Sequence, residues 1–394
     1  MSSYSIVIVS NEVPKPEPTS AGERLIREFY FALKESGHTP IFLAPKPRNG
    51  YAATYDVPRH FVDSEETVMK RFTAPLRHSL GAVPNLSFYM ALRQDEKAVS
   101  LLQEAVVIDM QWSSNILLAP LFRWINPDAK LVGTFHDINE QRIKRRAAVE
   151  PDQLKTLIWS TVGSVVGVVE GLATVFLDLV IVLSDKDRFL LRSPKKFKDK
   201  VHAVIPPVYL ESSKKLSTRS AGHEIVFVGT MYRWENHHAV EWFIQKVLPL
   251  IWEEKPEIEF TVVGESPSAD LVQMAKDSRI KFTGFLDDIE VAYDAATLLV
   301  SPIKLGSGVK FKTLDAILRG IPVVSTTAGV EGIAKVDWVS ALAEDPSTFA
   351  QKVLKVLDNY DYFVNKSLDY AIDARGIYSK ESYQALIRKL YLEI

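Results

Sequence analysis

The chain has 394 residues, of which 47% are hydrophobic and 24% charged, and its formal net charge is -2. This balance excludes the strongly basic composition that is typical of nucleic-acid-binding proteins. The sequence has no cysteine, which excludes disulfides, zinc–thiolate sites and a cysteine nucleophile and favours a reducing, cytoplasmic location. The length predicts two domains. No targeting signal is predicted, since residues 1–18 have neither a basic leader nor a small-residue cleavage site.

Short apolar runs alternate with helical patterns through the first half of the chain. The β-branched run at residues 5–9 predicts a strand, and residues 22–37 predict a helix that ends at Gly37. Further strands are predicted within residues 39–44, 105–110, 130–137 and 178–191. This alternation is typical of a parallel sheet covered by helices.

A polar stretch without apolar periodicity, residues 207–223, predicts the domain boundary. The alternation then restarts, and residues 236–254 predict a helix with one apolar stripe and a kink at Pro249. We therefore expect an N-terminal domain at 1–207, a C-terminal domain at 223–375 and a closing helix at 376–394. Strands in the second half are predicted within residues 224–230, 258–264, 280–285, 297–303 and 321–326.

The segment from Thr156 to Leu183 is unusually apolar. Its longest uncharged run, Thr156 to Val169, is shorter than the ~20 residues that span a bilayer. Gly163, Gly167 and Gly171 recur at every fourth residue, which favours close approach of another helix. Three roles stay open for this segment: internal packing, contact with a membrane surface, and contact with a second subunit. Nearby lysines at 195, 196 and 198 would attract anionic lipid.

The most informative stretch is the glycine-serine loop near residue 306, between a predicted strand and a predicted helix that ends at Gly320. In open parallel sheets, ligands bind at the carboxyl ends of the strands. Gly306 and Gly308 allow backbone N–H groups to approach an anion, and the helix behind adds the positive end of its dipole. Lys310 and Lys312 strengthen the prediction of a phosphate guest. The alternative is a plain turn with solvated lysines.

Five stretches together resemble glycosyltransferases of the GT-B fold and the family 4 type, which are retaining enzymes that use nucleotide-sugar donors. In the first half these are "TSAGERLIREFYFALKESGHTPIFLA", "GTFHD" and "LDLVIVLSDKDRFLL". In the second half they are "IVFVGTMYRWENHHAVEWFIQKVLPLI" and "GSGVKFKTLDAILRGIPVVSTTAGVEGI". The resemblance implies two Rossmann-like parallel-sheet domains that face a cleft, with the last helix crossing back to the first domain.

The chain departs from that family at three points. Many members carry two glutamates where this sequence has Leu305 and Asp315, and an Arg and Lys pair where it offers only Arg233. Lys310 and Lys312 are interpreted as taking over the diphosphate contact, as in the branch of the family with a "GSG" loop. Asp315 would then accept hydrogen bonds from the donor's ribose.

The resemblance also implies the remaining roles. The expected catalytic residues are His136, Lys310 and Asp315, with His136 near the transferred sugar. The donor-binding residues are expected to be Gly229, Thr230, Arg233, Phe285, Gly306, Ser307, Gly308, Val309, Lys312 and Glu331, and the acceptor-side residues Gly22 and Asp137. Plain structural alternatives are a helix pair of Asp315 with Arg319, a structural role for His136 and a loop charge for Glu331.

The expected function is retaining transfer of a sugar from a nucleotide-diphosphate donor to a saccharide or lipid-linked saccharide, in bacterial polysaccharide or glycoconjugate synthesis. No nucleic acid is expected from the composition and net charge. No metal is expected, because neighbouring Asp287 and Asp288 lie on a predicted turn and His237 and His238 point apart on a helix. A peripheral membrane contact and a homodimer stay open. The alternatives are another GT-B enzyme, such as a nucleotide-sugar epimerase or a phosphorylase, and a non-catalytic relative.

Overall fold

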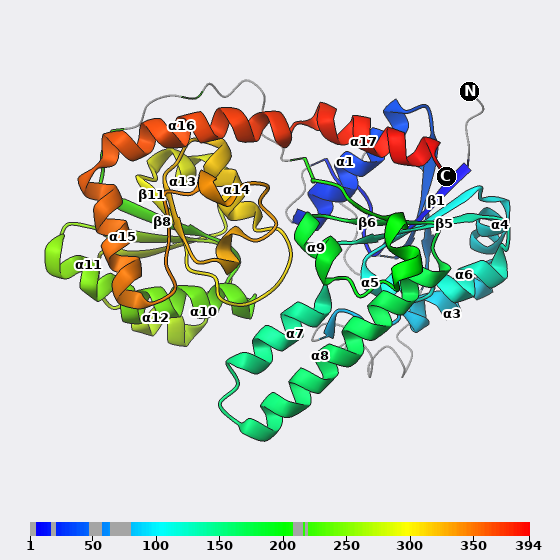
Figure 1. Ribbon diagram of the computed structural model, residues 1–394, viewed down its shortest axis with the longest axis horizontal. Coiled ribbons are helices and arrows are strands. Elements are labelled where there is room, and N and C mark those ends of the chain that lie inside the picture. The colour runs from blue at the N-terminus through cyan, green and yellow to red at the C-terminus, as the bar shows by residue number, and fades with distance from the viewer. Residues whose placement is uncertain (1–4, 17–20, 47–56, 64–79, 208–215, 217–219) are drawn as a thin grey trace. The chain divides into compact units, whose positions relative to one another are not determined.

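A computed structural model describes residues 5–16, 21–46, 57–63, 80–207, 216 and 220–394 (Figure 1). The chain divides into two compact units. The first unit combines Met1–Tyr209 with Tyr378–Ile394, and the second is Leu210–Ile377. Most of the predicted boundary at residues 207–223 lies outside the described residues.

The first unit is built on a seven-stranded sheet in the order β3-β2-β1-β4-β5-β6-β7. Every neighbouring pair is parallel. The strand order reverses between β1 and β4, which is where open parallel sheets bind ligands. The strands are β1 (Ser5–Val9), β2 (Thr39–Pro45), β3 (Arg59–Val62), β4 (Val107–Gln111), β5 (Lys130–Phe135), β6 (Leu179–Val182) and β7 (Val201–Ala203).

Helices cover this sheet and extend beyond it. A buried apolar core joins β1, β4, β5 and β6 to α3, α4 and α6, three helices that the sequence patterns did not predict. The helices of the first unit are α1 (Ala21–Glu35), α3 (Leu86–Gln94), α4 (Glu96–Glu104), α5 (Ser113–Ile116), α6 (Ala119–Ile125), α7 (Asn139–Ala148), α8 (Gln153–Ala173), α9 (Asp185–Leu190) and α17 (Lys380–Leu392).

The closing helix α17 packs on α1, so the chain ends in the unit where it began (Figure 1). The rings of Phe29 and Tyr391 meet edge to face, with centroids 6.0 Å apart. The apolar stripe of α17 is buried at Tyr383, Ile387, Leu390 and Tyr391. The predicted return of this helix to the first domain is therefore confirmed.

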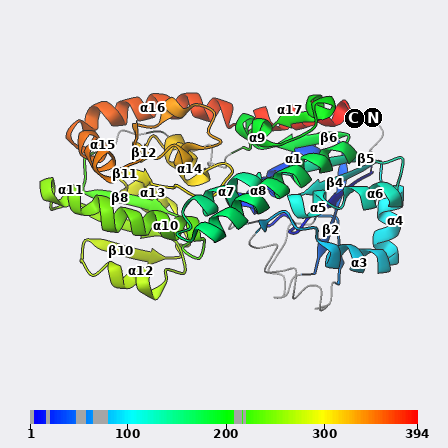
Figure 2. The same ribbon diagram turned by 60° about the horizontal axis from the view of Figure 1, so that its bottom comes forward.

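Helices α7 and α8 form a hairpin that projects beyond the seven-stranded sheet (Figures 1 and 2). The glycines of α8 face α7 and Arg192, in keeping with the close approach of another helix that their spacing predicts. A Cβ atom added to Gly167 would lie 2.0 Å from the Glu140 carboxylate, and one on Gly171 would lie 2.2 Å from the backbone oxygen of Arg192. The small residues therefore let α8 lie close to α7.

The opposite face of α8 is exposed and carries no charge. By length and composition, the helical stretch Gln153–Phe176 could cross a membrane, which differs from the conclusion drawn from its uncharged run. Within this stretch, 39% of the 18 residues with the highest mean hydropathy are buried in the protein. Length and composition alone are weak evidence that a helix spans a membrane. The exposed apolar residues are Leu154, Leu157, Ile158, Val165, Val168, Val169, Leu172, Val175 and Phe176.

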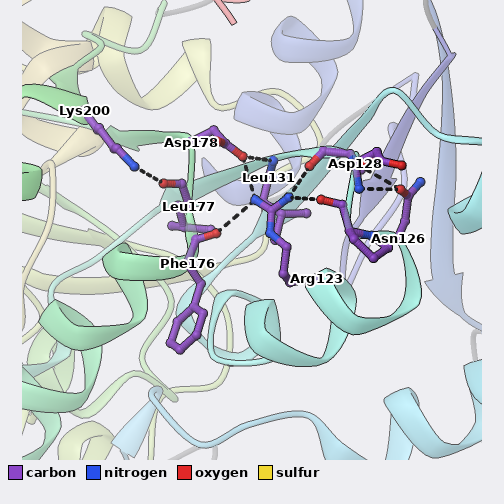
Figure 3. Close-up of polar contacts among 10 residues, drawn as sticks. Arg123, Asn126, Asp128, Leu131, Phe176, Leu177, Asp178 and Lys200 are labelled. Carbon is purple, nitrogen blue, oxygen red and sulfur yellow. Dashed lines mark hydrogen bonds and ion pairs between the residues drawn. The ribbon is translucent and has the colours of Figure 1, made fainter.

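The end of this helix is fastened at the amino ends of β5 and β6 (Figure 3). The Arg123 guanidinium donates to the Asp178 carboxylate at 2.7 Å and to the Ala129 carbonyl at 2.6 Å. Lys200, in the 3-10 turn η2 (Lys195–Lys200), donates to the Leu177 carbonyl at 2.9 Å. The Phe176 ring points away from these polar contacts (Figure 3).

The second unit contains a six-stranded sheet in the order β10-β9-β8-β11-β12-β13, with every pair parallel. Its strand order reverses between β8 and β11. The strands are β8 (Glu224–Val228), β9 (Glu259–Val263), β10 (Ile280–Gly284), β11 (Leu298–Ser301), β12 (Val323–Ser325) and β13 (Ala341–Leu342).

The predicted helix at residues 236–254 is helical throughout, but its hydrogen bonding changes along its length. A π turn at Phe243–Val247 lies directly before Pro249. Proline has no N–H to donate, and a local change of hydrogen-bonding register absorbs that loss. The helices of the second unit are α10 (Trp234–Trp242), α11 (Leu248–Glu254), α12 (Ala269–Met274), α13 (Glu290–Ala295), α14 (Phe311–Leu318), α15 (Pro346–Asp358) and α16 (Tyr360–Ile377).

Candidate functional site

In the second unit, the glycine-serine loop connects β11 to α14 at the reversal of strand order. Gly306 and Gly308 have φ angles of +85° and +73°, a conformation that costs glycine far less than other residues. Lys310 is the N-cap residue of α14. Its Nζ donates to the carbonyl oxygens of Ser307 at 2.7 Å and Gly308 at 3.0 Å. This ammonium therefore holds the loop in its curved shape.

Lys312 lies in the first turn of α14, and its side chain reaches the carboxyl end of β8. Its Nζ donates to Asn236 Oδ1 at 2.6 Å and lies 4.2 Å from the centroid of the Phe227 ring. Gly229 allows this approach, because a Cβ atom there would lie 2.5 Å from Lys312 Nζ. Burial, followed by the charges of Arg233 and Lys310, lowers the pKa of Lys312 well below its usual value. An anion bound here would offset that shift.

The predicted donor residues around β8 lie together. The carbonyl of Thr230 accepts from Asn236 Nδ2 at 2.8 Å, and Arg233 is the exposed N-cap of α10. Glu235 reaches the loop, since a Cβ atom on Gly306 would lie 3.1 Å from its Cγ. Phe285 is not part of this group: it follows β10, two strands from β8, and is 62% exposed.

The two acidic residues predicted for the donor are both buried. Asp315 Oδ1 lies 3.5 Å from Arg319 Nη1, so the helix pair that was the structural alternative is present. Arg319 also donates through Nε to Glu290 at 3.1 Å. The backbone oxygen of Glu331 accepts from the Lys310 N–H at 3.2 Å, which joins its loop to the start of α14. Val309 packs against this second loop at Gly332.

In the first unit, His136 follows β5 at the sheet's carboxyl edge. Its Nε2 lies 2.9 Å from Gln111 Oε1, and its ring stacks on Trp112 with centroids 4.3 Å apart. Burial lowers the pKa of His136 to about 3, so the imidazole is neutral at physiological pH. Trp112 has a φ of +68°, a strained conformation that costs about 1–3 kcal/mol and is common at functional sites.

Behind His136 lies a buried polar chain. Gln111 Nε2 donates to Asp109 Oδ1 at 2.5 Å and to Thr134 Oγ1 at 3.2 Å. The hydroxyl of Tyr391, from α17, donates to Asp109 Oδ2. Burial raises the pKa of Asp109 to about 7, against the lowering effect of its hydrogen bonds with Tyr391 and Gln111.

A second buried carboxylate, Glu170, fastens α8 to the same edge. It accepts from Ser113 Oγ at 2.8 Å and from Asn139 Nδ2 at 2.7 Å. Burial raises its pKa to about 7. Of the two predicted acceptor-side residues, Gly22 lies in the first turn of α1. Asp137 is half-buried and follows His136 directly.

Sequence reasoning missed Asp109, Gln111, Trp112, Asn236 and Glu170. A signal existed in the strand at 107–111, where polar residues stand at alternate positions of an otherwise apolar run and so share one face of the sheet. Within the described ranges, no group of three or more His, Asp or Glu side chains could hold a metal ion.

Comparison with known proteins identifies the second unit. Residues 222–359 match the family described as "Glycosyl transferases group 1". These residues are therefore similar to a group 1 glycosyltransferase domain. The domain contains the loop at Gly306, the Lys312 cluster and Glu331. His136 and its polar chain lie outside the matched residues.

Solved structures extend this likeness to the whole chain. HepE from Anabaena in complex with UDP has a TM-score of 0.66 at 12% identity, covering 99% of this chain and 100% of its own. Sucrose-phosphate synthase from Thermosynechococcus elongatus has a TM-score of 0.70 at 14% identity, covering 99% and 98%. The chain thus has the two-domain fold of the GT-B type, as predicted.

One relative from Klebsiella pneumoniae, described as "Uncharacterized 44.6 kDa protein in cps region", is 25% identical over 170 residues. The match spans 41% of this chain and 42% of that protein's length.

Proposed function

We propose that this glycosyltransferase moves a sugar from a nucleotide-diphosphate donor, with retention, to a saccharide or lipid-linked saccharide acceptor. One observation carries the proposal: a glycine loop and the half-buried Lys312 lie at the strand reversal of a domain similar to group 1 glycosyltransferases. HepE, solved with UDP and with UDP-glucose, supports a uridine nucleotide as the first donor to test. The relative in a cps region supports a place in bacterial polysaccharide synthesis.

The diphosphate would lie over the Gly306 loop. Backbone N–H groups of the loop and the amino end of α14 provide partial positive charge, and Lys312 and Arg233 provide full charges. Lys310, which holds the loop carbonyls, shapes this cradle. Asp315 and Glu331 remain proposed contacts for the ribose and the sugar hydroxyls.

In the reaction, the bond between the sugar's anomeric carbon and the diphosphate oxygen breaks while the acceptor oxygen bonds to that carbon. Negative charge grows on the departing diphosphate, where the prearranged dipoles and cations stabilise it. The acceptor attacks from the face that the diphosphate leaves, and its hydroxyl proton passes to a diphosphate oxygen. No side chain of the protein serves as a nucleophile.

His136 suits a contact with the sugar because it is neutral. A neutral imidazole exchanges hydrogen bonds with hydroxyl groups and adds no charge beside the developing cationic sugar. The proposal therefore gives His136 the orientation of the transferred sugar, and gives Asp137 and Gly22 places on the acceptor side.

Calorimetric titration with UDP, ADP and GDP tests the donor site, followed by release of free sugar from the matching nucleotide sugars. Binding of one nucleoside diphosphate together with turnover of its sugar is expected. Nucleotide binding without any turnover, with or without saccharide acceptors, would instead indicate a non-catalytic relative. Conversion of the nucleotide sugar to an epimer would indicate the epimerase alternative.

Metal independence is also proposed, since the cradle supplies its own cations. Activity should persist in EDTA. Loss of turnover that magnesium or manganese restores would contradict this part of the proposal.

The exposed apolar face of α8 is proposed to contact an anionic membrane surface, which would bring the enzyme to a lipid-linked acceptor. Its residues span more than five turns without a charged member. Residues 139–200 carry twelve Lys and Arg against eight Asp and Glu, although the whole chain has a net charge of -2. Two copies of so basic a region would repel each other, whereas anionic lipid would attract it. A homodimer through this face is therefore the less favoured alternative.

A further inference from the structure

We infer that Asp109, Gln111 and Tyr391 are positioning residues that fix the tautomer of His136, so that Nε2 carries the proton and Nδ1 accepts hydrogen bonds. The inference concerns the hydrogen-bond chain that runs from the closing helix to the edge of the first sheet. It rests on the proposed function only in giving His136 a sugar hydroxyl as its partner.

The chain begins at the Asp109 carboxylate, which is fully buried. At pH 8.5, above the pKa of about 7, this carboxylate is ionised and only accepts hydrogen bonds, so both of its oxygens need donors. The Tyr391 hydroxyl donates to Oδ2, and Gln111 lies 2.5 Å from Oδ1. Gln111 must therefore turn its Nε2 amide group, and not its oxygen, toward Asp109.

This orientation decides what Gln111 offers to the histidine. With Nε2 facing Asp109 and Thr134, Oε1 faces His136 Nε2 at 2.9 Å. An amide oxygen cannot donate, so the ring nitrogen opposite it must carry the hydrogen. A neutral imidazole has a single N–H, which leaves Nδ1 as the acceptor.

The backbone holds these groups in register. Asp109 and Gln111 lie on the same face of β4 because successive side chains of a strand alternate. On the neighbouring strand β5, Gln111 is paired with Thr134, two residues before His136. Trp112 stacks on the imidazole and limits its rotation. The links from Asp109 through Gln111 to His136 are thus fixed by a strand or by ring stacking.

The consequence is chemical selectivity. An acceptor Nδ1 suits a hydroxyl that donates, such as one on a sugar, whereas an Nδ1–H would suit a carbonyl or phosphate oxygen. The closing helix affects the tautomer of His136 through the hydrogen bond from Tyr391 to Asp109, which lies 282 residues away in the sequence.

Nitrogen-15 NMR of the full chain labelled at histidine, at pH 8.5, tests the inference. The signals of His136 are those that disappear in His136→Gln, and they should show the Nε2–H form. In Asp109→Asn, Tyr391 donates to the remaining amide oxygen, so the new NH₂ group faces Gln111. Gln111 must then turn its own oxygen toward that NH₂ group, and His136 should change to the Nδ1–H form.

Thr134→Val is the matched control, because Asp109 alone suffices to orient Gln111, and the tautomer should not change. If Asp109→Asn does not fold, Gln111→Met removes the oxygen that faces His136 and should populate both forms. An Nδ1–H form in the unaltered protein, or an unchanged Nε2–H form in either folded variant, would overturn the inference.

Turnover separates this inference from the proposed function. Where Asp109→Asn changes the tautomer, kcat should fall roughly tenfold, the loss expected for about one hydrogen bond. A changed tautomer with unchanged kcat would leave the network standing and refute the role of His136 at the sugar. An unchanged tautomer would refute the network whatever the activity.

Discussion

The hydroxyl of Tyr391 donates a hydrogen bond to the buried carboxylate of Asp109, which joins the last helix to the central strand of the first unit. Both residues are buried, since Asp109 is 0% and Tyr391 7% exposed. Removing the hydroxyl leaves a buried carboxylate oxygen without this donor, and such a loss costs about 1–3 kcal/mol.

Tyr391→Phe should therefore lower the free energy of unfolding by about 1–3 kcal/mol at pH 8, as measured by urea denaturation. Tyr362→Phe is the matched control, because Tyr362 is 61% exposed and should change stability by less than ~0.5 kcal/mol. Equal stability of the two variants would show that the hydrogen bond adds nothing.

The buried carboxyls of Asp109 and Glu170 predict a specific pH dependence of stability. Burial raises both pKa values to about 7, above those of the unfolded chain. The folded state then holds protons that the unfolded state releases, so the contribution of these two carboxyls to stability falls as pH rises from about 4 to about 7 and levels off above. Glu170→Gln should reduce this slope. The check is the denaturation midpoint at pH 5, 6, 7 and 8, and an identical slope in the variant would contradict the assignment.

The lowered pKa of Lys312 predicts that an anion binds together with a proton. A nucleoside diphosphate should restore the charge of Lys312, so affinity should fall as pH rises. Calorimetry in two buffers of different ionisation enthalpy measures the proton uptake directly. Lys312→Met should abolish that uptake and weaken binding by about 1.5–3 kcal/mol. Lys281→Met, at an exposed pair with Glu259, is the control. Proton uptake that persists in Lys312→Met would show that a group other than Lys312 takes up the proton.

The apolar face of α8 predicts membrane binding that depends on lipid charge. The protein should float with phosphatidylglycerol vesicles at low salt and stay soluble with phosphatidylcholine vesicles. Val165→Glu combined with Val168→Glu should abolish flotation. Val272→Glu, at an exposed valine of α12, should not. Protein that remains soluble with both lipids would remove the membrane proposal, and a dimer lost in the double variant would favour a second copy of the chain.

Deletion of residues 378–394 should expose the apolar surface of α1 and lower transfer activity, with little change in nucleotide affinity. Binding of an apolar dye and donor titration check the two parts. Full transfer activity in a soluble truncated protein would show that α17 only covers apolar surface locally and does not contribute to transfer.

The sequence predicted the parallel sheets well because buried strands need continuous apolar runs. Residues 5–9 form β1 with the predicted bounds, and the glycine loop leads into α14 as expected. It predicted side-chain geometry less well. Lys310 bends back to its own loop, and Asp109 and Tyr391 meet only because the chain returns across hundreds of residues. Pairings of this kind depend on tertiary structure and leave no local pattern.

The return of α17 to the first unit also sets an order on synthesis. Protein domains usually fold as they leave the ribosome, from the N-terminus onward. Here the first unit includes Tyr378–Ile394, which is translated after the second unit, Leu210–Ile377. Asp109 must wait for a hydrogen-bond donor that emerges only after the whole glycosyltransferase domain has been made. The first unit is therefore completed only after the second unit has been made.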